Sequence, residues 1–189
     1  MSTALAVWQN QYVAKKAMFS LLGNAFRLYA ADGSLAFFVK QKAFRLKEEI
    51  VVFADEKQST PRLRINARSI LDFGATYDIT DPDGSKIGAC RREGLKSMFR
   101  DSWLVLDTND QTIATIKEDS MLMALLRRML LPIIPQRFTV ADTTGKEIGT
   151  LRQRFNIFQL GYDVHFEGLD PRIGVAATVL LLAIEGRQK

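Results

Sequence analysis

The sequence contains few of the side chains on which metal sites and disulfides depend. Its 189 residues include one cysteine, Cys90, and one histidine, His165. A single cysteine excludes an internal disulfide and favours a reducing compartment. A zinc ion would need further ligands around His165, and its neighbours Asp163 and Glu167 are more typical of a solvent-facing row on a strand. We therefore expect no metal site.

Motifs that present a catalytic serine or cradle a phosphate are also missing from the sequence. No two glycines stand two positions apart, which excludes the Gly-x-Gly of dinucleotide-binding folds. No Gly-x-Ser-x-Gly segment is present to hold a nucleophilic serine. Residues 144–146, Thr-Gly-Lys, match the end of a phosphate loop, but the first glycine of that motif is missing. We therefore expect a non-enzymatic protein with no catalytic residues and no cofactor.

No apolar run of the chain is as long as a bilayer requires. The most apolar uncharged run, residues 173–184, has 12 residues, whereas a spanning helix needs about 20. The first 16 residues also lack the basic start and the long apolar run of a signal peptide. We therefore expect a cytoplasmic protein, either free or peripheral to the membrane.

The most distinctive segment that the sequence does contain is residues 171–186. Apolar side chains face every direction of a helical wheel here, and such a helix must be surrounded by other groups. Asp170 can cap its start, Pro171 suits its first turn and Gly186 can end it. We predict that this helix fills the protein core, and a membrane span that borrows flanking charged residues is the alternative. The expected core side chains are Val175, Val179, Leu180, Leu181, Leu182 and Ile184.

Four segments of the chain repeat one pattern. An aromatic residue opens an alternating run, a polar turn follows, and a second alternating run closes the unit. Asn and Asp tolerate positive φ and Gly adopts it freely, so these turns predict β-hairpins. The segments are 26–39, 77–90, 103–116 and 138–151, with turns at Asp32-Gly33, Asp83-Gly84, Asn109-Asp110 and Thr144-Gly145.

Further alternating or β-branched runs raise the expected number of strands to about twelve. A strand of six or seven residues and a helix of about 14 residues are both about 20 Å long. A closed sheet of this size has room for one helix. We therefore predict a mainly β fold, a closed barrel of about twelve antiparallel strands around a central hydrophobic C-terminal α-helix. The additional strands are expected at Tyr12–Met18, Ile50–Ala54, Arg62–Ala67 and Leu160–Phe166.

The domain organisation follows from this pattern. We predict one barrel domain at residues 11–189, preceded by an N-terminal tail at residues 1–10. A second helix is expected at residues 119–131, where Met and Leu form one face. Packing of that face on the barrel is the favoured interpretation, and a membrane-surface helix is the alternative.

Three segments resemble the tubby C-terminal-like superfamily, which includes LURP-one-related and phospholipid scramblase-like proteins. They are DGSLAFFVKQK (32–42), DPDGSKIGACRR (81–92) and YDVHFEGLDPRIGVAATVLLLAIEG (162–186). The resemblance covers residues 11–186 and implies a twelve-stranded barrel wrapped around a central hydrophobic helix. Scramblase-like relatives are linked to calcium through an acidic segment before that helix. Here this segment holds only Asp163, Glu167 and Asp170, which speaks against calcium binding.

Basic residues outnumber acidic ones by five, and two basic stretches alternate along predicted strands. Their side chains should point outward, because the barrel interior is apolar. The resemblance to tubby-like proteins implies that such a patch holds an anionic phospholipid head group. A solvated strand face is the alternative, and nucleic acid is disfavoured because no aromatic stacking motif is interleaved there. The candidate binding residues are Lys40, Lys42, Arg45, Lys47, Arg62 and Arg64, which Arg68 would join if the alternation continued.

The sequence therefore favours a non-enzymatic β-barrel module that binds anionic phospholipid head groups at the membrane surface. A structural or protein-interaction module without a small ligand is one alternative. A scramblase-like, membrane-associated protein is another. The corresponding partners are an anionic membrane lipid or another protein.

Overall fold

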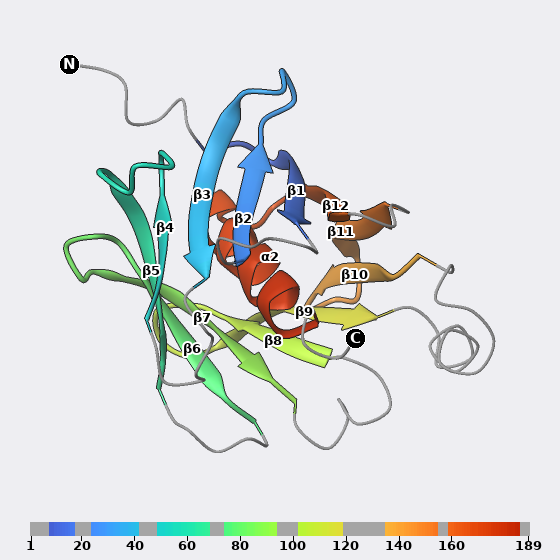
Figure 1. The fold of residues 1–189 in the computed structure, drawn as a ribbon. Coiled ribbons are helices and arrows are strands. Elements are labelled where there is room, and N and C mark those ends of the chain that lie inside the picture. Colours follow the sequence, from blue (N-terminus) through green and yellow to red (C-terminus); the bar gives the residue numbers. More distant parts are fainter. Residues whose placement is uncertain are drawn as a thin grey trace.

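A computed structural model describes residues 8–17, 24–41, 49–68, 74–93, 102–118, 135–154 and 159–185. These residues form twelve strands followed by one helix, α2 (Figure 1). The strands are β1 (Gln11–Ala17), β2 (Asn24–Tyr29), β3 (Leu35–Gln41), β4 (Ile50–Phe53), β5 (Pro61–Ala67), β6 (Thr76–Thr80), β7 (Lys86–Arg92), β8 (Ser102–Leu106), β9 (Thr112–Glu118), β10 (Arg137–Asp142), β11 (Glu147–Arg154) and β12 (Gln159–Phe166), and α2 covers Pro171–Glu185.

The strands form one closed antiparallel barrel. Each strand pairs with the next along the chain, and β1 pairs with both β2 and β12, which closes the ring. Ala14, for example, lies opposite Leu28 of β2 and Tyr162 of β12. The predicted fold class, a mainly β barrel of about twelve antiparallel strands with one C-terminal helix, is confirmed.

The connections at one end of the barrel are hairpins, and four of them share the same pattern of backbone hydrogen bonds in the turn. The hairpins join β2 to β3, β4 to β5, β6 to β7, β8 to β9 and β10 to β11, and a register shift next to each turn marks a β-bulge. Each hairpin contains one residue with positive φ. The four turns predicted from the sequence are confirmed. The residues with positive φ are Gly33, Gln58, Gly84, Asp110 and Gly145.

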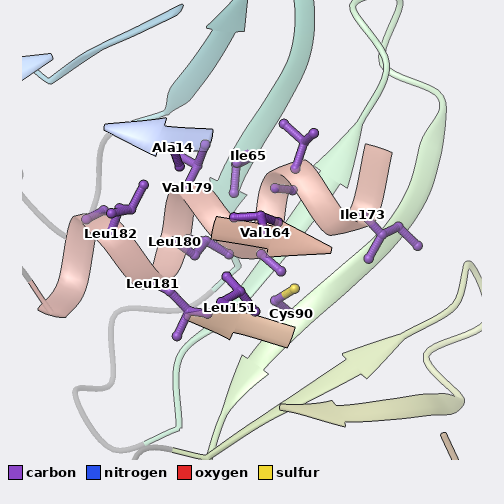
Figure 2. Packing of buried hydrophobic residues seen from close by; sticks show 14 of the residues in the cluster. Ala14, Ile65, Cys90, Leu151, Val164, Ile173, Val179, Leu180, Leu181 and Leu182 are labelled. Carbon is purple, nitrogen blue, oxygen red and sulfur yellow. The ribbon is translucent and has the colours of Figure 1, made fainter. Parts of the chain in front are cut away.

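Helix α2 enters the barrel at the hairpin end and runs along its interior (Figure 1). Asp170 caps it, since Oδ1 accepts a hydrogen bond of 2.9 Å from the backbone N–H of Arg172. The helix approaches β5, β7 and β12 most closely. Figure 2 shows its side chains among inward-facing residues of the strands, such as Ile65 and Val164. The helix therefore lies where the sequence placed it, inside the closed sheet.

The predicted core of α2 is buried where its side chains are described. Val175, Val179, Leu180, Leu181 and Leu182 are at most 4% exposed. The side chain of Ile184 lies outside the described residues. No helix in the described ranges is long and apolar enough to cross a membrane.

Two other sequence predictions concern the ends of the domain and its second helix. Residues 119–131, the expected amphipathic helix, lie outside the described residues. Of the expected tail, residues 8–10 pack on the barrel. The ring centroids of Trp8 and Phe37 are 4.7 Å apart, and the backbone N–H of Phe166 donates to the carbonyl oxygen of Asn10 at 2.9 Å.

Candidate anion-binding surface

Three of the six predicted binding residues are described, and all three lie on the outer face of the barrel. Lys40 of β3 is exposed, while Arg62 and Arg64 of β5 are half-buried. Leu63 and Ile65, which alternate with the two arginines, are fully buried on the inner face. The other three residues, Lys42, Arg45 and Lys47, lie outside the described residues.

Arg64 already has an anionic partner. Its Nη1 lies 2.9 Å from both carboxylate oxygens of Glu49, and both side chains are more than a third exposed. Exposed pairs of this kind contribute about 0–1 kcal/mol, because water competes for both charges. Glu49 therefore occupies Arg64 only weakly, and a phosphate could displace it.

Arg62 has a donor without an acceptor. Its Nε is buried, and no residue in the described part of the chain accepts a hydrogen bond from it. A buried donor left unpaired costs about 1–3 kcal/mol. Because this Nε is shielded from solvent, a bound anion would meet the other donors of the guanidinium. Arg62 is therefore a candidate as an outward-facing cation that no carboxylate of the described residues pairs with.

Strand β4 lies between Lys40 and the two arginines. Two strand spacings separate β3 from β5, about 10 Å in all. The outward residues between them include Phe53 of β4, which lies directly opposite Phe38 of β3. The sequence analysis expected no aromatic stacking motif on this face, and strand register places these two aromatic residues directly opposite each other on it. The cations and rings form one surface, but they do not converge on one point.

Arg27 of β2 is a further cation of this surface, and sequence reasoning missed it. Its Nε lies 2.6 Å from Oε1 of Glu56, and this hydrogen bond raises the pKa of Arg27. Its guanidinium carbon lies 5.4 Å from the ring centroid of Phe38, within the range of a cation–π interaction. Alternation alone predicts that Arg27 points outward. Its position over Phe38 depends on the register between β2 and β3, which the sequence does not show.

Arg68 does not extend the basic face as the alternation suggested. Its Nη2 lies 2.8 Å from Oδ1 of Asp110, and its Nε lies 2.9 Å from Oδ2 of Asp78. Nζ of Lys86 also lies 2.8 Å from Oδ1 of Asp110. Hydrogen bonds from Arg68 and Lys86 hold the pKa of Asp110 well below its usual range. This network, defined by Arg68, Asp78, Lys86 and Asp110, ties β5, β6, β7 and the β8–β9 turn together on the outer face.

The barrel interior also contains charged groups that the sequence analysis did not expect. Lys16 of β1 and Glu118 of β9 occupy inward-facing positions of their strands and are buried. Nζ of Lys16 lies 5.2 Å from the ring centroid of Phe26. Gln136 links Glu118 to Tyr162, since its Nε2 donates to Glu118 at 3.2 Å and its Oε1 accepts from the Tyr162 hydroxyl at 3.0 Å. The expectation of a wholly apolar interior is therefore incomplete.

The side chains considered as metal ligands either form hydrogen bonds with protein groups or are buried alone. Nε2 of His165 lies 3.1 Å from Oε1 of Glu167, while Asp163 accepts a hydrogen bond of 2.8 Å from Nε of Arg154. Cys90 is buried inside the barrel, which raises the pKa of its thiol to about 12. Among the described residues, no group of three His, Cys, Asp or Glu side chains is arranged to hold a metal ion.

Comparison with known proteins identifies the family of the chain that carries this surface. Residues 35–130, which run from the start of β3 past the end of β9, match the sequence model of the family described as LURP-one-related. No curated protein and no solved structure matches the chain. The match covers half of the 189 residues, including Lys40, Arg62 and Arg64. The chain belongs to the LURP-one-related family.

Proposed function

We propose that this protein is a non-enzymatic binding module that holds anionic phospholipid head groups on the outer face of β3–β5, at the cytoplasmic surface of a membrane. Lys40 and Arg62 carry this proposal. They are outward-facing cations, and no carboxylate of the described residues pairs with either of them. The wider likeness to tubby-like and scramblase-like proteins, inferred from the sequence, stays a prediction.

The filled interior of the barrel supports binding on the outside. Many barrels of similar size hold a ligand along their axis. Here α2 lies along the axis, and its residues from Ile173 to Ala183 are buried against the strands. A ligand that leaves the fold intact must therefore bind the outer wall or the ends of the barrel.

The chemistry of the outer wall suits a phosphate group. Arg62 and Arg64 offer planar guanidinium donors, and Lys40 offers a compact ammonium on a flexible stem. Each basic residue near an anionic bilayer contributes about 1 kcal/mol of attraction, which salt screens within a Debye length. Binding through these residues should therefore be strong at low salt and weak at high salt.

Co-sedimentation with vesicles tests this proposal. The wild-type protein should bind vesicles of phosphatidylcholine and phosphatidylserine at low salt, and it should not bind phosphatidylcholine alone. The double variant Lys40→Glu/Arg62→Glu should bind at least about tenfold more weakly. A matched control is Arg91→Glu/Lys117→Glu, which makes the same charge change at exposed positions of β7 and β9, outside the β3–β5 face.

Two results would contradict the proposal. If the wild-type protein does not bind anionic vesicles at low salt, it does not bind phospholipid head groups. A protein-interaction module would then be the better description. Equal weakening of binding by the two double variants would show that only net charge matters. The thermal unfolding of both variants should match that of the wild type.

A further inference from the structure

Strand register builds a continuous row of cations and rings across the outer wall. Consecutive strand pairs place its members directly opposite one another, and directly opposed residues share one face of a sheet. The row therefore crosses six strands without an acidic residue. Its members are Arg154 of β11, Gly161 of β12, Lys15 of β1, Arg27 of β2, Phe38 of β3 and Phe53 of β4.

Two of the three cations of this row, Lys15 and Arg27, lie over aromatic rings. Nζ of Lys15 is 4.9 Å from the ring centroid of Tyr29, and the guanidinium of Arg27 covers the ring of Phe38. Phe38 is only 6% exposed although it points away from the core. Gly161 places no side chain between Lys15 and Arg154. A Cβ atom there would lie 3.7 Å from Cβ of Arg154.

The wall around this row keeps an excess of positive charge. Asp163 pairs with Arg154, and Glu56 pairs with Arg27. No carboxylate of the described residues pairs with Lys15 or with Arg152, an exposed residue of β11. The half-buried Val13 and Tyr29 add apolar area beside these cations. We call this surface the β11–β3 face, defined by Val13, Lys15, Arg27, Tyr29, Phe38, Arg152 and Arg154.

The hairpin end has the opposite charge. The five hairpin turns and the connection between β12 and α2 contain ten of the 21 acidic residues and two of the 26 basic residues. Those segments therefore carry a formal charge of −8, and the rest of the chain carries +13. They cover residues 30–34, 54–60, 81–85, 107–111, 142–146 and 167–170, where residue 142 is also the last residue of β10.

We infer that the β11–β3 face docks on an anionic lipid bilayer, with the acidic hairpin turns held away from it. This inference rests on the proposed function and extends it, because it adds a contact area centred on β1 and β2 to the residues of β3 and β5. Basic side chains meet the head groups, and Val13 and Tyr29 reach the interface between head groups and acyl chains. Repulsion between the lipid and the turn carboxylates fixes the orientation.

Two features of the β11–β3 face favour a lipid surface over nucleic acid. Sequence-tolerant binding of single strands needs rings that are free to stack on bases. Arg27 covers Phe38 and Lys15 lies over Tyr29, so cations already occupy these rings. The face also carries the half-buried Val13 and Tyr29 beside its cations, and apolar groups of this kind suit the interface between head groups and acyl chains.

Site-specific labelling tests the orientation. The native Cys90 is buried and its thiol has a pKa of about 12, so an introduced cysteine can be labelled alone at pH 7. A polarity-sensitive fluorophore is attached in one variant to Val13→Cys, on the β11–β3 face. In the other it is attached to Thr143→Cys, an exposed position of the β10–β11 turn. Vesicles contain phosphatidylcholine and phosphatidylserine.

We expect the Val13 label to shift to the blue and to resist quenching by iodide when vesicles are added. The Thr143 label should keep its emission and its quenching rate. Two results overturn the orientation while the proposed function survives. In one, the protein binds vesicles and the Thr143 label is protected instead. In the other, both labels remain exposed on the bound protein. Absence of any wild-type binding overturns both proposals.

A charge reversal on the same face gives a second readout. Lys15→Glu/Arg152→Glu should weaken vesicle binding at least about tenfold, while Arg91→Glu/Lys117→Glu, outside the β11–β3 face, should bind like the wild type. The Lys15→Glu/Arg152→Glu variant could bind vesicles with wild-type affinity while Lys40→Glu/Arg62→Glu still loses binding. That result overturns the wider contact face. The wild-type protein could instead bind an RNA oligonucleotide more tightly than the vesicles, and the Lys15→Glu/Arg152→Glu charge reversal could weaken that binding. This result overturns the lipid assignment.

Discussion

At the scale of single residues, the chain uses glycine in two different ways, and only one of them is visible in the sequence. Gly33, Gly84 and Gly145 follow Asp or Thr in polar turns, so their positive φ could be predicted. Gly174 instead lets α2 approach β12, and a Cβ there would lie 2.6 Å from a ring carbon of Phe166. Such a contact requires knowledge of which strand the helix touches, and no local pattern carries that information.

Gly84 offers a clean test of the hairpin geometry. Its φ is +94°, and no atom lies within 4 Å of the position that a Cβ would take, so substitution there tests backbone strain alone. Gly84→Val should lower the free energy of unfolding by about 1–3 kcal/mol, because β-branched residues resist positive φ. Gly84→Asn should cost less, since Asn tolerates this region and Asp110 occupies the equivalent position. Denaturant unfolding of both variants measures the difference, and equal stability of Val and Asn would refute the strain argument.

At the scale of elements, the sequence predicted the strands well and their partners only in part. Alternation and turn residues located the hairpins. The polarity of each side chain indicates which face of a strand it occupies, and Asn, Asp and Gly mark the turns. Register between strands that are not hairpin partners depends on bulges and on barrel closure, as in the pairing of Lys15 with Gly161. The sequence therefore suggested an outward Arg62 and Arg64 but missed Glu49 beside Arg64 and the row through Lys15 and Arg27.

The network of Arg68, Asp78, Lys86 and Asp110 predicts how these elements respond to acid. The pKa of Asp110 is lower in the folded protein than its unfolded value of about 3.9, because Arg68 and Lys86 donate hydrogen bonds to it. The unfolded chain therefore takes up the proton first as the pH falls. The stabilisation is fully present above about pH 5 and is lost progressively below about pH 4.

Asp110→Asn should isolate this contribution while keeping the turn, because Asn tolerates the φ of 62° at this position. We expect the variant to melt at a lower temperature than the wild type at pH 7. The difference should shrink as the pH is lowered towards 2. A difference in melting temperature that stays constant from pH 7 to pH 2 would show that the ion network does not link these elements.

At the scale of the whole molecule, the fold separates two tasks. Helix α2 fills the interior, and the outer wall and the hairpin turns carry opposite charge. The composition predicted both an apolar helix and a positive net charge. It did not predict that the acidic residues gather at the hairpin end, because that placement appears only once the turns are known to share one end of the barrel. A filled interior leaves the outer surface as the place of binding.

The central claim is that α2 holds the barrel together from inside. Its six buried Val, Leu and Ile side chains contribute about 1.5–3 kcal/mol each, which matches the roughly 5–15 kcal/mol that stabilises a typical domain. Leu181→Lys should therefore prevent folding, because it buries an unpaired charge. Leu181→Met, which conserves volume, should cost less than about 1.5 kcal/mol.

The most direct measurement is the thermal unfolding of a chain that ends after Glu167 and so lacks α2, compared with the full chain in the absence of detergent. The full chain should be monodisperse and should unfold in one cooperative transition. The shortened chain should aggregate or show no cooperative transition, because a barrel without α2 has an empty core. A shortened chain that remains monomeric, unfolds cooperatively and is more soluble than the full chain would contradict this and identify α2 as a membrane anchor.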